Sequence, residues 1–289
     1  MKQRNQGILL IICAGLFFSF MTFFVRISGN LPTMQKTFFR NLFPVFFASI
    51  TLARSEKKFH IRKDSILPLV GRSFFGILGV IANFYAIDKL NLSDANMLNK
   101  LSPFFAIIFS YFILKEKANK IEWLAVIVAF IGALFIIKPS FQMEFIYALI
   151  GLLGGMLAGL AYTYIRKLGK SGERGPVIVL VFSLFSCIVT APFLIVGYEP
   201  MTMKQLLCLL MAGVSATGGQ FCITAAYTKA PAKDISVFDY FQILFAAILG
   251  FLFLEQMPDW LSFIGYIIII GSAVFKWWYI KNRKEPNVS

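Results

Sequence analysis

Long apolar runs separated by short polar segments account for most of this chain. The runs lie near residues 7–28, 33–54, 66–88, 93–114, 120–138, 145–167, 176–197, 204–228, 234–254 and 259–280. Their polar and apolar positions do not alternate with a period of two, which favours helices over the strands of a barrel. Backbone polar groups within a lipid bilayer must bond inside the protein. The pattern therefore predicts an all-α protein that crosses a membrane ten times.

The composition supports a membrane protein. Hydrophobic residues make up 58% of the chain and charged residues only 15%, with a mean hydropathy of +0.75, whereas soluble domains carry about 25% charged residues. A net charge of +14 would favour nucleic acid as the partner of a soluble protein. Here no loop is long enough to fold as a basic domain, so the expected partner is the lipid bilayer and not nucleic acid.

The basic residues also predict the orientation. With the N-terminus in the cytoplasm, the cytoplasmic segments hold nineteen lysines and arginines, and the opposite side holds five. Because basic loops stay on the cytoplasmic side of a membrane, both termini are expected in the cytoplasm.

The sequence repeats at an offset of about 140 residues. Adding 139 to the residue number carries Glu116 onto Glu255, Gly132 onto Gly271 and Lys100 onto Asp239. We expect one repeat over residues 1–140 and a second over 141–289. Because five is an odd number of spans, the second repeat begins on the opposite side of the membrane and is inverted relative to the first. Such inverted repeats are common in secondary transporters, whose substrate sites lie near the membrane midplane between the repeats.

Lys100 and Asp239 are the first candidates for a functional site, because they place opposite charges at equivalent points of the two repeats. An intramembrane charge costs about 2.5–3.5 kcal/mol on insertion scales, so it is a functional candidate by default. The two side chains could hold opposite charges of a ligand across a central cavity. They could instead form a permanent ion pair that only connects the repeats. Arg40 and Arg72 lie nearer to helix ends and are expected to anchor those ends at the membrane interface, with a role as ligand contacts as the alternative.

Further polar residues at membrane depth complete the predicted substrate site. Asn96 and Asn99 share a helical face with Lys100, and Tyr240 and Gln242 lie beside Asp239. The remaining candidates on other spans are Ser19, Asn83, Tyr85, Tyr162 and Gln220. We expect the tyrosines to flank an apolar or cationic part of a ligand.

Several motifs resemble those of the drug/metabolite transporter superfamily, specifically its EamA-type members with ten helices. They are Ser102-Pro103 followed by an apolar run to Lys115-Glu116, a second run from Phe245 to Leu254-Glu255, and the related segments around Gly15 and Gly159. The resemblance covers nearly the whole chain. It implies a multi-pass transporter of the bacterial inner membrane that moves a small polar or charged metabolite by alternating access. Coupling to protons, through Asp239, or exchange of one metabolite for another is also expected.

Two alternatives stay open at this point. The run Phe238-Asp-Tyr-Phe-Gln242 resembles bacterial members likened to S-adenosylmethionine uptake carriers. A membrane scaffold or channel without carrier activity is the alternative from another class. The sequence does not distinguish a monomer from a homodimer.

The residue inventory argues against an enzyme and predicts no cofactor. The only histidine is His60, in a predicted loop, so a zinc site of the H-E-x-x-H type and a histidine-based triad lack their residues. The four cysteines lie in apolar runs without a C-x-x-C pair, which is typical of small buried side chains rather than metal ligands.

Overall fold

The computed structural model describes residues 2–55, 60–89, 98–137, 145–254 and 259–282, and every regular element in these residues is helical. The long helices are α1 (Lys2–Ile27), α2 (Thr33–Ala53), α3 (Ile66–Lys89), α5 (Ser102–Leu114), α6 (Lys120–Ile137), α7 (Phe145–Lys170), α8 (Gly175–Val196), α9 (Met203–Lys229), α11 (Phe241–Leu254) and α12 (Trp260–Asn282). The short elements are η1 (Lys63–Ser65), α10 (Ala232–Ile235) and η2 (Ser236–Tyr240). The prediction of an all-α polytopic protein with ten long helices is confirmed.

The outer faces of the helices are apolar. Seven helical segments of the described residues are long and apolar enough to cross a membrane, and α5 is a shorter apolar helix. Large hydrophobic side chains stay exposed on these faces, among them Phe46, Phe112, Ile195 and Ile267. Because water would not cover so much apolar surface favourably, lipid is the solvent that this surface fits.

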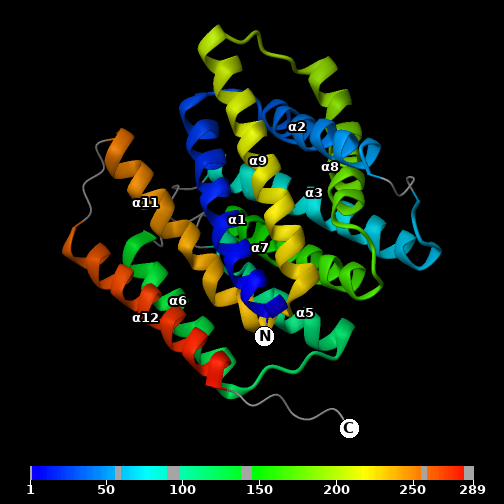
Figure 1. The fold of residues 1–289 in the computed structure, drawn as a ribbon. Helices are drawn as coiled ribbons and strands as arrows, with labels where there is room; N and C mark the ends of the chain where they lie inside the picture. Colours follow the sequence, from blue (N-terminus) through cyan, green and yellow to red (C-terminus); the bar gives the residue numbers. More distant parts are fainter. Residues whose placement is uncertain (1, 56–59, 90–97, 138–144, 255–258, 283–289) are drawn as a thin grey trace.

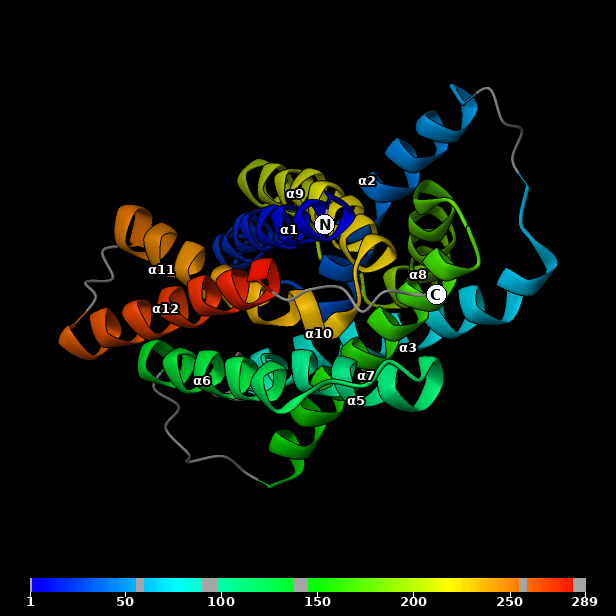
Figure 2. The same cartoon turned by 60° about the horizontal axis from the view of Figure 1, so that its bottom comes forward.

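The helices pack with an internal two-fold relation between the repeats. α1 packs against α9, and its counterpart α7 packs against α3. α2 packs against α8, and α6 against α12, so each of these helices contacts its own counterpart. Figures 1 and 2 show α6 and α12 along one edge, α2 and α8 along the opposite edge, and α1 and α9 between them.

The ninth predicted span is interrupted, which corrects the expectation of one continuous helix over 234–254. The chain forms the single turn α10, then the 3-10 turn η2, and becomes α-helical at Phe241. The fourth span is also interrupted, because Lys100 and Leu101 form a turn before α5 begins at Ser102. Pro103 explains this second break, since proline has no N–H to donate to the carbonyl of Asn99 four residues earlier. Lys100 and Asp239 thus both lie at helix interruptions.

Two glycines, one in each repeat, allow a helix of that repeat to approach the interruption in the other repeat. A Cβ atom at Gly15 of α1 would lie 3.1 Å from the backbone nitrogen of Gln242. A Cβ atom at Gly159 of α7 would lie 2.8 Å from the carbonyl oxygen of Ser102. Only glycine permits such approach without displacing the neighbouring backbone. The two glycines that the sequence relates to each other therefore make corresponding contacts, α1 with α11 and α7 with α5.

We expect Gly159→Ala to destabilise the protein by about 1–3 kcal/mol, because overpacking forces the α5 backbone away from α7. Thermal unfolding of the purified protein in detergent measures this effect. Gly271→Ala is the matched control, since nothing lies within 4 Å of a Cβ atom at Gly271 of α12. Equal unfolding temperatures for the two variants would show that α5 and α7 are not in close contact.

Candidate functional site

Lys100 and Asp239 meet between the two repeats. The Nζ atom of Lys100 lies 3.1 Å from Oδ2 of Asp239, and the two residues are 6% exposed each. The interrupted helices bring them together, because each residue lies in a turn outside the α-helical hydrogen-bond ladder. An ammonium and a carboxylate that leave water together avoid the larger penalty of leaving it alone.

A hydrogen-bond network surrounds this ion pair. The Nζ atom of Lys100 also donates to Oε1 of Gln242, at 2.7 Å. The hydroxyl of Tyr240 donates to the carbonyl oxygen of Lys100, at 3.1 Å. The Ser19 hydroxyl lies 2.8 Å from the carbonyl oxygen of Gln242 and so connects α1 to the same network. Side chains from α1, the turn before α5, η2 and α11 therefore hold the junction of the repeats.

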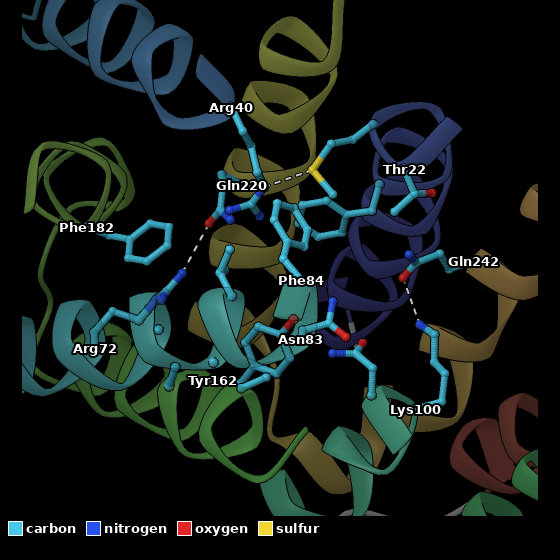
Figure 3. A pocket seen from close by; sticks show the side chains of 18 residues that line it. Thr22, Arg40, Arg72, Asn83, Phe84, Lys100, Tyr162, Phe182, Gln220 and Gln242 are labelled. Carbon is cyan, nitrogen blue, oxygen red and sulfur yellow. Dashed lines mark hydrogen bonds between the residues drawn. The ribbon is translucent and has the colours of Figure 1, made fainter. Parts of the chain in front are cut away.

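A cavity of about 120 Å³ opens beside the Lys100 side chain (Figure 3). Helices α1, α2, α3, α7, α8, α9 and α11 contribute to its wall, together with the turn before α5. The lining residues are Phe18, Met21, Thr22, Arg40, Arg72, Gly76, Gly79, Val80, Asn83, Phe84, Asn99, Lys100, Ala158, Ala161, Tyr162, Phe182, Gln220 and Gln242. Since the wall combines apolar side chains with amides and cations, the cavity can accept a polar molecule.

The cavity includes part of the predicted substrate site. Six of the predicted residues line it, namely Asn83, Asn99, Lys100, Tyr162, Gln220 and Gln242. Asp239 and Ser19 lie behind the wall, where they contact Lys100 and Gln242. Asn96 lies outside the described residues. The role of all these residues in substrate binding stays a prediction.

Two of the predicted aromatic residues do not face the cavity in this structure. Tyr85 is 39% exposed and contacts the ring of Tyr147, with the ring centroids 6.2 Å apart. Tyr240 is fully buried, with its hydroxyl on the carbonyl of Lys100. Of the three tyrosines expected to flank a ligand, only Tyr162 lines the cavity, where its ring stacks on Tyr227 with a centroid distance of 4.9 Å.

Arg40 and Arg72 line the cavity, which corrects the expectation that they anchor helix ends at the membrane interface. Arg40 is 5% exposed and Arg72 is 3% exposed. The Nε atom of Arg40 lies 2.9 Å from the sulfur of Met21. Arg72 donates from Nη2 to Oε1 of Gln220, at 3.1 Å, and its guanidinium lies 3.9 Å from the ring centroid of Phe182. The sequence signal that could have identified them as cavity residues is that each arginine lies within an apolar run.

A further buried cation lies outside the cavity and was not singled out by the sequence analysis. Lys276 of α12 is fully buried, and its Nζ atom lies 3.9 Å from Oε1 of Glu122 on α6. This contact joins counterpart helices at the edge of the protein, away from the cavity lining. We therefore assign it to helix packing.

The helical fold with its buried polar cavity between inverted repeats is that of a multi-pass membrane transporter, and comparisons with known proteins specify the family. The model of the EamA-like transporter family matches residues 5–138 and again residues 145–277. The chain therefore belongs to the EamA-like transporter family, within the drug/metabolite transporter superfamily.

Named relatives agree with this assignment. The pseudopaline exporter CntI of Pseudomonas aeruginosa is 31% identical over 273 residues, which cover 93% of this chain and 95% of that protein. Human solute carrier family 35 member G1 is 23% identical, covering 94% of this chain and 80% of its own length. A solved crystal structure matches with a TM-score of 0.80 over 93% of this chain and 96% of its own, at 15% identity, which shows the fold alone.

We expect Tyr240→Phe to lower the free energy of unfolding by about 1 kcal/mol, because a buried carbonyl loses its hydroxyl donor. Tyr85→Phe is the matched control, since Tyr85 is partly exposed and makes a ring contact. Thermal unfolding in detergent compares the two variants. A larger effect of Tyr85→Phe would contradict the description of the network around Lys100.

Proposed function

We propose that this protein is a secondary carrier that moves a small polar or charged metabolite by alternating access. The observation that carries the proposal is the cavity at the junction of the repeats, with the Lys100–Asp239 ion pair in its wall and behind it. Transporters with inverted repeats bind substrates at such interruptions of helices near the midplane. A scaffold would need neither a polar cavity nor charges at this depth.

Polar contacts connect the ends of α5, α7 and α9. Oε1 of Glu116, just beyond α5, lies 3.0 Å from Nε of Arg166 and 2.8 Å from Nζ of Lys170, both on α7. Arg166 also donates from Nη1 to the carbonyl oxygen of Thr228 on α9, at 3.1 Å. The Lys170 side chain is 43% exposed, and exposed ion pairs contribute about 0–1 kcal/mol each, so this contact can open and close during transport.

The mechanism that we propose uses the Lys100–Asp239 pair as the element that responds to substrate. In this structure the two charges compensate each other across 3.1 Å. A substrate that brings opposite charges would compete for both side chains and separate them. Because one residue belongs to each repeat, their separation would favour movement of the repeats relative to each other, which opens one end of the protein and closes the other.

The proposal includes the bacterial inner membrane as location, with both termini in the cytoplasm. The excess of lysine and arginine in alternate loops supports this orientation, and the start of α1 and the end of α12 lie on the same side of the protein (Figure 1). Export is the direction to test first, because a relative that is 31% identical is named an exporter. S-adenosylmethionine uptake gains no specific support from the cavity.

Counterflow in proteoliposomes tests carrier function. The probes are glutamate, citrate, glucose 6-phosphate and S-adenosylmethionine. Each compound is loaded unlabelled inside the vesicles and added in radiolabelled form outside. We expect saturable exchange of at least one probe, with at least a tenfold loss in Lys100→Ala and in Asp239→Ala. The control is Lys204→Ala, which changes an exposed lysine in the first turn of α9. An ion current without saturable exchange would indicate a channel and contradict the proposal.

Proton coupling through Asp239 makes a separate prediction. If protonation of this carboxylate drives transport, Asp239→Asn removes the titrating group while it keeps the size of the side chain. We expect transport by this variant to become independent of an imposed pH gradient, while exchange across membranes without a gradient persists. The measurement compares initial uptake rates with and without the gradient. An unchanged dependence on the gradient in Asp239→Asn would exclude Asp239 as the coupling residue.

A further inference from the structure

We propose that Arg40 and Arg72 form an oxyanion-binding subsite in the central cavity, which takes a carboxylate or phosphate group of the substrate. The proposal rests on the carrier function, because the bound anion is a substrate only if the protein transports it. It narrows the substrate class from a polar or charged metabolite to an organic anion.

The charge of the cavity wall is the first argument. Three basic residues, Arg40, Arg72 and Lys100, line the cavity, and no acidic residue does so among the described part of the chain. Lys100 is compensated by Asp239. Within the described residues, neither arginine has a carboxylate oxygen within 4 Å. The cavity wall therefore holds two positive charges that the protein does not neutralise.

Unused hydrogen-bond donors are the second argument. The Nη1 atom of Arg40 and the Nε atom of Arg72 are buried and have no hydrogen-bond partner. At 5% and 3% exposure, these side chains have lost most of their contact with bulk solvent. The contact of Arg40 to the sulfur of Met21 recovers little, because a thioether is a weak acceptor. A buried donor without a partner costs free energy, and a bound oxyanion would recover it.

The geometry fits one bound group. The two arginines extend from α2 and α3 into the same cavity, and Figure 3 shows both side chains directed toward the region of Gln220. The volume of about 120 Å³ is well above what a single water molecule needs, which leaves space for the anionic end of a small ligand. Guanidinium groups bind carboxylates and phosphates through paired hydrogen bonds.

Surrounding groups set the orientation of this end of the ligand. Gln220 accepts a hydrogen bond from Nη2 of Arg72, and the ring of Phe182 packs on the guanidinium face. These two contacts hold the side chain in place and leave its Nε atom without a hydrogen-bond partner. The Oδ1 atom of Asn83, in the same wall, is a buried acceptor without a partner. A hydroxyl or amino group next to the oxyanion would supply the donor that this oxygen lacks.

A purely structural role for Arg40 predicts the opposite change in unfolding temperature when no ligand is added. If the guanidinium stabilises the fold, its removal lowers the unfolding temperature. If the charge is kept for a ligand, Arg40→Met removes an uncompensated buried charge and retains an unbranched side chain, so the ligand-free unfolding temperature rises by about 2–4 °C. An unfolding temperature at or below that of the wild type would overturn the proposal.

Binding of chosen anions is measured by thermal unfolding of the full chain in detergent. The probes are succinate with its neutral diamide, and glycerol 3-phosphate with glycerol. We expect at least one oxyanion to stabilise the protein when its neutral partner does not, and the stronger of the two distinguishes carboxylate from phosphate. The apparent affinity should fall at least tenfold in Arg40→Gln and in Arg72→Gln. Arg26→Gln, at an exposed arginine of α1, should match the wild type.

The outcomes separate this inference from the carrier function. Stabilisation by the neutral compounds equal to that by the anions, or anion binding that persists in the Arg40→Gln/Arg72→Gln double variant, would overturn the oxyanion subsite. Arginine-dependent anion binding without exchange in proteoliposomes would preserve the subsite and contradict the carrier. Exchange of a substrate that is unaffected by both arginine substitutions would preserve the carrier and contradict the subsite.

Discussion

The requirement to place two opposite charges inside a membrane protein determines the organisation of this structure. Lys100 and Asp239 belong to different repeats, and each would be costly to bury alone. Their side chains meet because the fourth and ninth spans are both interrupted there, so the turns can present them to each other. Gly15 and Gly159 let the neighbouring helices α1 and α7 approach these interruptions closely. The packing of four helices is thus arranged around one ion pair.

The same arrangement leaves room for a polar cavity beside the pair. The repeats provide corresponding helices and contacts, but the cavity wall is not symmetric, because its two uncompensated cations, Arg40 and Arg72, both come from the first repeat. In the account proposed here, the symmetric part of the fold supplies two related states. The asymmetric part supplies the chemistry that selects a ligand. Membership of the EamA-like transporter family is consistent with this division, since one fold can serve many substrates.

Much of the fold, but only part of the site, could be predicted from the sequence. The apolar run at 176–197 became α8, Gly175–Val196, because a long uncharged apolar segment can cross lipid as a helix. The break at Pro103 has a local cause, whereas η2 has no proline within it and depends on packing. Arg40 lies about 10 Å from the start of its helix at 1.5 Å per residue, a depth that suits either a membrane anchor or a cavity residue. The packing of α2 against other helices decides which way the Arg40 side chain points. In the same way, the packing of α3 decides the direction of Tyr85, and the packing of α7 that of Tyr162.

A double-mutant cycle on Lys100 and Asp239 tests whether the two buried charges depend on each other. Thermal unfolding in detergent is measured for Lys100→Met, for Asp239→Leu and for the double variant. We expect each single change to cost about 3–5 kcal/mol, because it leaves the other charge buried without compensation, and the double change to cost far less than their sum. Additive costs would show that the two charges do not depend on each other, and would contradict an account in which this pair holds the repeats together.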